Sequence, residues 1–164
     1  MSPTKQYNVY ILDGFSDMQK ESIIEGFHEW ETASMSTVTF IQVNSLDHYQ
    51  SLITVAPISE KEMEIIHKDK IGWATYHGSD TDIIIVTELG YRDFYQTVLH
   101  EFGHALGLDH DLNLKHAYRT TMMEHTLDST ARVTCLDLRS LCLSWGCDAN
   151  EFIRCKTATD LELQ

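Results

Sequence analysis

Apolar and polar positions along this 164-residue chain alternate between two periods. Short stretches with alternating or consecutive apolar residues predict strands, and longer stretches with apolar residues three or four apart predict helices. The predicted strands are 7–12, 36–43, 51–56, 71–76 and 81–88, and the predicted helices are 16–33, 58–68 and about four turns that start with Asp93 as N-cap. This order predicts an α+β domain with a twisted, mixed β-sheet.

The first predicted helix, 16–33, has both a start signal and a core face. Ser16 followed by Gln19 predicts a capping box, in which each side chain accepts a hydrogen bond from the other residue's backbone N–H. Four apolar residues fall on one helical stripe and are predicted to be buried: Ile23, Ile24, Phe27 and Trp30.

Composition and charge narrow the class of protein. Hydrophobic residues make up 43% of the chain, there are only two Pro, and no apolar run reaches the roughly 18 residues that a membrane span needs. Twelve basic against 25 acidic residues give a net charge of −13, which repels phosphate backbones and acidic membranes. We expect one soluble domain over 1–155, a flexible tail over 156–164, and a monomer with neither nucleic acid nor membrane as partner.

The stretch QTVLHEFGHALGLDHD, residues 96–111, concentrates the candidate chemistry. His100 and His104 are four apart, so on a helix both imidazoles project from one face and can reach one metal ion. Glu101 lies beside the metal rather than pointing at it. There its carboxylate can act as general base toward a metal-bound water.

Gly107 and His110 extend this pattern beyond a bare H-E-x-x-H. A glycine that adopts the left-handed conformation commonly ends a helix, and a sharp turn there can bring His110 back as the third ligand. Three neutral imidazoles leave the fourth position of a zinc ion open for water, as in catalytic zinc sites. The sequence therefore predicts one catalytic zinc ion bound by His100, His104 and His110, with Glu101 as the catalytic residue.

Residues 100–110 match the H-E-x-x-H-x-x-G-x-x-H signature, and the chain resembles the metzincin zinc endopeptidases. The segment LHEFGHALGLDH is most similar to the matrixin branch, the matrix-metalloproteinase-like peptidases. The resemblance implies a metzincin-like catalytic domain with an active-site helix, a backing helix and a C-terminal helix at 134–146. It also implies a methionine turn beneath the zinc, for which Met123 fits best and Met122 is the alternative.

The resemblance covers most of the chain, but three features depart from the matrixin pattern. The segment 45–70 is longer than that pattern, and His125 stands where matrixins usually have proline. No cysteine precedes position 135, so the upstream cysteine that holds many matrixins latent is absent from this sequence.

Other readings of the same residues remain open. Glu124 and Asp128 resemble the E-x-x-x-D pattern of thermolysin-like zinc peptidases, in which a glutamate is the third ligand. That reading leaves Gly107 and His110 without a role. A zinc hydrolase of a non-protein amide could use the same ligands, and a binding protein could retain zinc without catalysis, although such a protein gains nothing from Glu101.

A peptidase needs its substrate, a protein or peptide, extended across the active site, and an exposed strand edge can hold a peptide in that form. The segment TDIIIVTE, residues 81–88, is the candidate edge, and its apolar run otherwise predicts a buried strand. His77, Asp80 and Asp82 are expected to be turn and strand-end residues. Bound calcium is possible, but no complete calcium-loop signature supports it.

All four cysteines lie between 135 and 155. If 134–146 is a helix, Cys135 and Cys142 are about 10.5 Å apart along its axis, too far to share one zinc ion or one disulfide. Pairing of Cys142 with Cys147 and of Cys135 with Cys155, or four free thiols, remain possible. We expect two disulfides.

The chain starts with MSPTKQYNVYIL, which lacks the basic start and apolar stretch of a secretory signal. We expect a protein that stays where it is made, a protein that is exported without such a signal, or a chain whose start has been trimmed. Disulfides would indicate export, and free thiols would indicate the cytoplasm.

Overall fold

The structure is a computed structural model that describes residues 5–34, 37–47, 50–110 and 137. Several predictions made from the sequence fall outside these residues: the methionine turn at Met122 or Met123, the alternative ligand Glu124, the helix 134–146, the four cysteines and the tail 156–164.

Five strands form one mixed sheet with the order β2-β1-β3-β5-β4. The strands are β1 (Lys5–Ile11), β2 (Val38–Gln42), β3 (Leu52–Ile58), β4 (Gly72–His77) and β5 (Asp80–Val86). Strand β1 pairs in parallel with β2 and with β3, and β3 pairs in parallel with β5. Strand β4 pairs antiparallel with β5 through a tight hairpin. The predicted mixed sheet is confirmed.

Three helices occur in the part of the chain that the structure describes: α1 (Asp17–Ala33), α2 (Glu60–Ile66) and α3 (Tyr91–Ala105). The capping box that opens α1 is confirmed, because the Ser16 side chain accepts from the Gln19 backbone and the Gln19 side chain accepts from the Ser16 backbone. On the predicted stripe Ile23, Phe27 and Trp30 are buried, and Ile24 is partly buried.

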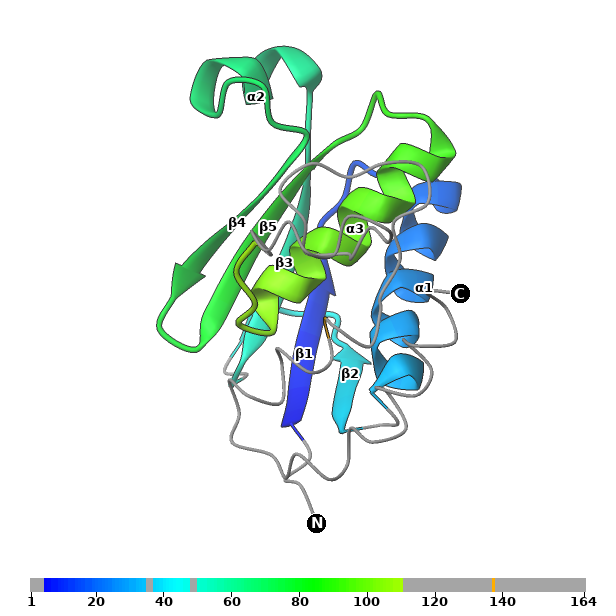
Figure 1. Cartoon of the computed structure of the whole chain (residues 1–164), viewed down its shortest axis with the longest axis vertical. Coiled ribbons are helices and arrows are strands. Elements are labelled where there is room, and N and C mark those ends of the chain that lie inside the picture. Colours follow the sequence, from blue (N-terminus) through cyan, green and yellow to red (C-terminus); the bar gives the residue numbers. More distant parts are fainter. Residues whose placement is uncertain (1–4, 35–36, 48–49, 111–136, 138–164) are drawn as a thin grey trace, which may run out of the picture.

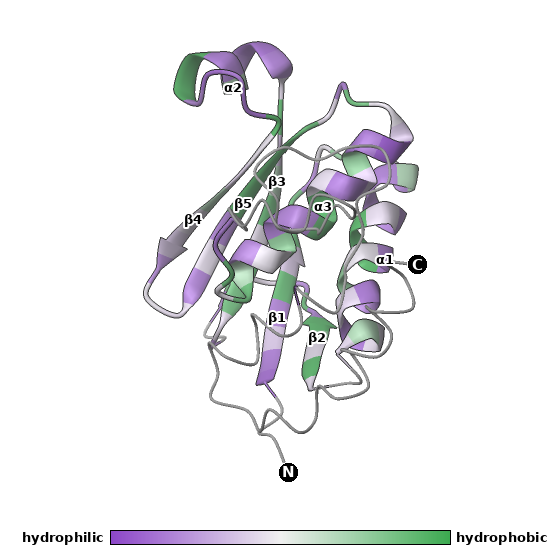
Figure 2. Ribbon diagram, in the orientation of Figure 1, coloured by the Kyte–Doolittle hydropathy of each residue, from purple (hydrophilic) through white to green (hydrophobic). Residues whose placement is uncertain are grey.

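Helices α1 and α3 lie side by side over one face of the sheet, and α2 lies beyond the end of strands β3 and β4 (Figure 1). Apolar residues concentrate in the central strands, while α1 and α3 carry apolar and polar residues in bands along their length (Figure 2). The core forms where the apolar sides of both helices meet the sheet, with Phe27, Phe40 and Phe102 in mutual ring contact. This arrangement confirms the predicted α+β class.

The prediction that 81–88 is the exposed edge of the sheet is wrong. Strand β5 pairs with β3 on one side and with β4 on the other, so it lies inside the sheet. Within its apolar run Ile83, Ile85 and Val86 are buried, whereas Ile84 is only partly buried. The free edge on this side of the sheet, within the described residues, is β4.

The predicted start of α3 is also wrong. The helix begins at Tyr91 with Gly90 as N-cap, and Asp93 lies in its first turn. Gly90 offers no side-chain acceptor, so the usual N-cap signal is missing from the sequence. Asp93 is still favourable where it lies, because a carboxylate in the first turn interacts well with the positive end of the helix dipole.

None of the helices in the described ranges is both long and apolar enough to pass through a membrane.

Trp30 ties the backing helix α1 to α3. Its indole Nε1 donates a buried hydrogen bond of 2.9 Å to the carbonyl of Leu99, the residue before His100. Since the ring is fully buried, it holds α3 in place both by its volume and by this directional contact.

We predict that Trp30→Phe lowers the free energy of unfolding by about 1 to 3 kcal/mol, because it removes a buried hydrogen bond and leaves a small cavity. Urea unfolding followed by circular dichroism measures this change. Trp73→Phe is the control, since Trp73 is only partly buried and stacks on His67 away from the core. An equal loss in both variants would contradict the assigned role of Trp30.

Candidate metal centre

Helix α3 separates an apolar side from a polar one. Phe94, Val98, Leu99 and Phe102 are at most 2% exposed and pack in the core. The helix periodicity places the polar residues of its second half on the remaining side. The core therefore fixes the rotation of α3, and this rotation determines which way its histidines point.

The end of α3 is a Schellman motif. Gly107, at φ 98°, is in the left-handed region, and its N–H donates to the carbonyl of His104. The N–H of Leu108 donates to the carbonyl of Gly103, and the Leu108 side chain is buried. These are the two hydrogen bonds of that motif, in which glycine takes the left-handed position at no steric cost. The chain reverses here and brings His110 back toward the helix, as the glycine spacing predicts.

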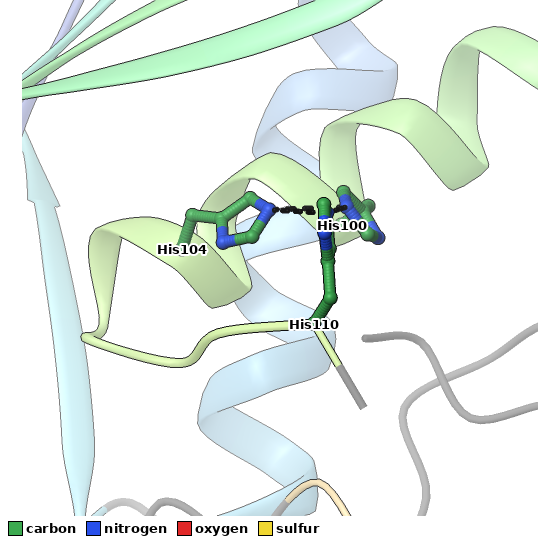
Figure 3. A group of neighbouring side chains, drawn as sticks. All are labelled: His100, His104 and His110. Carbon is green, nitrogen blue, oxygen red and sulfur yellow. Dashed lines mark hydrogen bonds between the residues drawn. The ribbon is translucent and has the colours of Figure 1, made fainter. Parts of the chain in front are cut away.

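The structure brings His100, His104 and His110 together (Figure 3). The Nε2 atom of His100 lies 3.1 Å from that of His104 and 3.1 Å from that of His110, and the last two are 3.2 Å apart. Two of the side chains come from successive turns of α3 and the third from the segment after the turn (Figure 3). The three nitrogens thus form a nearly equilateral triangle.

This triangle fits a zinc ion. Ligand nitrogens about 2.05 Å from a tetrahedral zinc are about 3.3 Å from one another. The Nδ1 of His104 lies 2.7 Å from the carbonyl of Leu108, which can only accept, so Nδ1 carries the proton and Nε2 presents a lone pair to the centre of the triangle. Burial lowers the pKa of His104, against the smaller opposing effects of Leu108 and Asp109, which favours the neutral form that binds metal.

Glu101 is buried next to this triangle. It is 5% exposed, and its Oε2 atom has no hydrogen-bond partner among the residues that the structure describes. Burial raises the pKa of the carboxyl to about 8, and the positive charge of Lys70 offsets part of this effect. A buried carboxyl oxygen without a partner is costly for a fold, so this position is typical of a functional group.

The histidines and Glu101 line one cleft of about 760 Å³ between α3 and β4. Within the described residues its walls contain one lysine and no arginine, and the residues that line it are Asp69, Lys70, Ile71, Gly72, Trp73, Ala74, Tyr76, Thr97, His100, Glu101, His104, Asp109 and His110. An open cleft beside the free edge of a sheet can accept an extended chain.

Tyr76 joins the edge strand to the end of α3. Its hydroxyl donates a hydrogen bond of 2.7 Å to the carbonyl of His104. Burial, with smaller contributions from Asp109 and Glu101, raises the pKa of this phenol, so it remains a donor. The contact fixes the distance between β4 and the backbone of a candidate metal ligand.

Sequence reasoning did not single out Tyr76, Gly72 or Lys70 as residues of this site. A signal was present for two of them: Gly72 and Tyr76 are four apart in a strand, so they share one face. Glycine within a strand also marks a place where another group approaches closely. Which face meets α3 depends on the strand order, which the sequence does not reveal.

The other candidate residues lie on the hairpin between β4 and β5 and are held by contacts within the hairpin and with β3. The imidazole of His77 lies 2.9 Å from the carboxylate of Asp82, and Asp80 accepts a hydrogen bond from the backbone of Leu52. Among the described residues the three histidines form the one cluster with the geometry of a metal site. The expectation that His77, Asp80 and Asp82 are turn and strand-end residues agrees with these positions.

No protein-family model matches this chain, and no curated protein sequence matches it. Solved structures do. Myroilysin aligns with a TM-score of 0.59 at 14% identity over 90% of this chain and 96% of its own, and the zinc-protease hatching enzyme high choriolytic enzyme 1 from the medaka fish Oryzias latipes aligns with 0.57 at 11% identity over 90% and 95%. At these identities the likeness is one of fold alone: this chain shares the α+β fold of these two proteins, with a five-stranded mixed sheet in its described residues.

Proposed function

We propose that this protein is a zinc-dependent endopeptidase. One observation carries the proposal: three imidazole nitrogens converge to within 3.2 Å of one another, beside a buried carboxylate, in a cleft along a free strand edge. A structural zinc site has four protein ligands and needs no carboxylate beside it, whereas three ligands with an adjacent general base are the arrangement of hydrolytic zinc enzymes.

The fold supports this proposal, since high choriolytic enzyme 1 is described as a zinc-protease. We further propose that the chain is related most closely to the matrixin branch, on the sequence LHEFGHALGLDH, with Met123 as the residue of the methionine turn and residues 1–155 as the peptidase domain. These finer assignments rest on the resemblance of the sequence.

His100, His104 and His110 would hold the metal, and Leu108 would orient one of them through its carbonyl. When bound, zinc supplies a Lewis acid that polarises the scissile carbonyl, lowers the pKa of water and favours the ionised form of a nearby carboxyl. The carboxylate of Glu101 accepts the proton of the attacking water and passes it to the leaving amine. Its burial keeps bulk water away from that proton.

The substrate in this proposal is a protein or peptide that lies along β4. The backbone groups on the outer side of β4 are free to pair with an extended chain, because β4 is the edge of the sheet in the described residues. Gly72, Ala74 and Tyr76 line the cleft from this strand. A peptide paired with β4 therefore passes the three histidines with its backbone extended, which suits cleavage within a chain.

We predict that Glu101→Gln retains one zinc ion per chain and loses peptidase activity by at least about 10²-fold, because it removes the base and leaves the three imidazoles in place. Zinc content by atomic absorption and cleavage of a denatured protein measure the two properties. Retained activity would refute the role of Glu101, and an inactive but zinc-loaded wild type would refute the peptidase proposal.

We predict that His110→Ala lowers zinc affinity by orders of magnitude, because two imidazoles do not complete a tetrahedral site. Glu124→Ala is the matched variant, since Glu124 is the third ligand in the thermolysin-like alternative and lies outside the described residues. Competition against a chromogenic chelator measures both affinities. Loss of affinity in the Glu124 variant alone would favour that alternative.

We predict that the metal-free protein becomes less stable as the pH rises from 6.5 to 8. The carboxyl of Glu101 has a pKa near 8 when folded and 4.5 when unfolded, so in this range the unfolded chain binds fewer protons than the folded one. Stability then falls with rising pH, by about 1 to 2 kcal/mol over this range. Urea midpoints across this range should fall less in Glu101→Gln, which has no proton to lose. Equal pH dependence in both proteins would show that Glu101 is not buried as described.

A further inference from the structure

Gly72 is where the edge strand meets the candidate general base. It is the first residue of β4 and is buried. A Cβ at this position would lie 2.6 Å from Cγ2 of Thr97, 2.8 Å from Oε1 of Glu101 and 3.0 Å from Cγ of Glu101. Carbon atoms do not approach that closely without repulsion, so any other residue here must displace a neighbour.

We propose that Gly72, together with Thr97, is a positioning residue that determines where the carboxylate of Glu101 lies. This inference rests on the proposed function, in which Glu101 is the general base. The backbone of β4 at Gly72 forms one wall of the space that the carboxylate occupies, and the methyl group of Thr97 forms another. Only glycine leaves this space wide enough.

The side chain of Thr97 is the neighbour of Gly72 that is held in place. It lies one turn before Glu101 on α3, is 2% exposed, and its hydroxyl donates a hydrogen bond of 2.7 Å to the carbonyl of Asp93. This bond selects the side-chain rotamer, and the rotamer directs the methyl group toward Gly72. Rotation of Thr97 away from a new Cβ would break this partly buried hydrogen bond.

The side chain of Glu101 is the neighbour of Gly72 that can move. Its carboxylate is at the end of a side chain with three rotatable bonds, and its Oε2 atom has no hydrogen bond to hold it in the described part of the chain. Crowding at Gly72 is therefore relieved mainly by displacement of this carboxylate. A displacement of the order of 1 Å at a reacting group can lower the rate by about 10²-fold.

A second glycine, Gly26, provides a matched control for Gly72. Gly26 on α1 packs against the opposite side of α3, where a Cβ would lie 2.5 Å from Cγ1 of Val98. Its neighbour there is a core side chain and not the candidate base. Gly72→Ala and Gly26→Ala thus each add one methyl group that crowds α3, but only the methyl group of Gly72→Ala crowds Glu101.

The first test measures turnover per zinc-loaded chain. We expect Gly72→Ala to lower kcat by about 10²-fold with KM changed less and one zinc per chain retained. Gly26→Ala should lower the melting temperature but leave kcat unchanged. Thr97→Ser keeps the hydroxyl and removes the methyl group nearest to the new Cβ, so the double variant Gly72→Ala/Thr97→Ser should recover several-fold in kcat. Turnover of Gly72→Ala within twofold of the wild type would overturn the proposal, as would an equal loss of kcat in Gly26→Ala.

The second test needs neither zinc nor activity. In the metal-free protein, the fall in urea midpoint that Gly72→Ala causes should shrink when Glu101 is already Ala, because the truncated side chain makes room for the methyl group. The fall caused by Gly26→Ala should be the same in both backgrounds. Additive effects of Gly72→Ala and Glu101→Ala would overturn the contact whatever the protein catalyses. Coupling in a protein whose wild type cleaves no peptide would instead support the contact and refute the proposed function.

Discussion

The burial of one face of α3 is the constraint on which the rest of the structure depends. This face is packed between α1 and the sheet by Phe94, Val98, Leu99 and Phe102, all nearly inaccessible to solvent. Once these side chains are buried, the helix can neither rotate nor slide, and the polar side must face β4. The direction of the histidines is thus a consequence of hydrophobic packing, and their mutual contacts follow from it.

The same packing supports a site that is unfavourable by itself. The carboxyl of Glu101 is 5% exposed, and one of its oxygens has no hydrogen-bond partner in the described part of the chain, so its burial opposes folding. Such a group persists only where the surrounding structure holds it, and here the core and the bond from Trp30 to Leu99 do so. The buried carboxyl is an example of a local conflict that marks function rather than a fault in the fold.

What could be predicted from the sequence was local along the chain. The capping box at Ser16, the apolar stripe of α1 and the turn at Gly107 depend on residues within a few positions of each other, and short-range spacing reveals them. The prediction that β5 rather than β4 is the edge strand was wrong because it depended on contacts that are not local. Strand order depends on contacts between distant segments, and an apolar run such as 83–86 is equally compatible with several places in a sheet.

The site shows the same division between local and distant contacts. The three histidines and Glu101 lie within eleven consecutive residues, so their spacing alone indicates that they meet. Gly72 and Tyr76 approach them from another element, the strand β4. Tyr76 lies 28 positions before His104, which it contacts, and Gly72 lies 29 positions before Glu101. Asp93 was expected to start α3 because it is a good N-cap, but the chain begins the helix two residues before it, at Tyr91, behind a glycine that carries no signal of its own.

The turn at Gly107 has a consequence for how metal binding is linked to folding. Because all three histidines come from residues 100–110, a bound ion would close only a very short loop, and it would restrict little of the unfolded chain's conformational entropy. The ion would hold the last turn of α3 against the segment that follows it and would not join distant parts of the sheet. Loss of the ion would then loosen the end of one helix, while the β-sheet and the buried face of α3 stay folded.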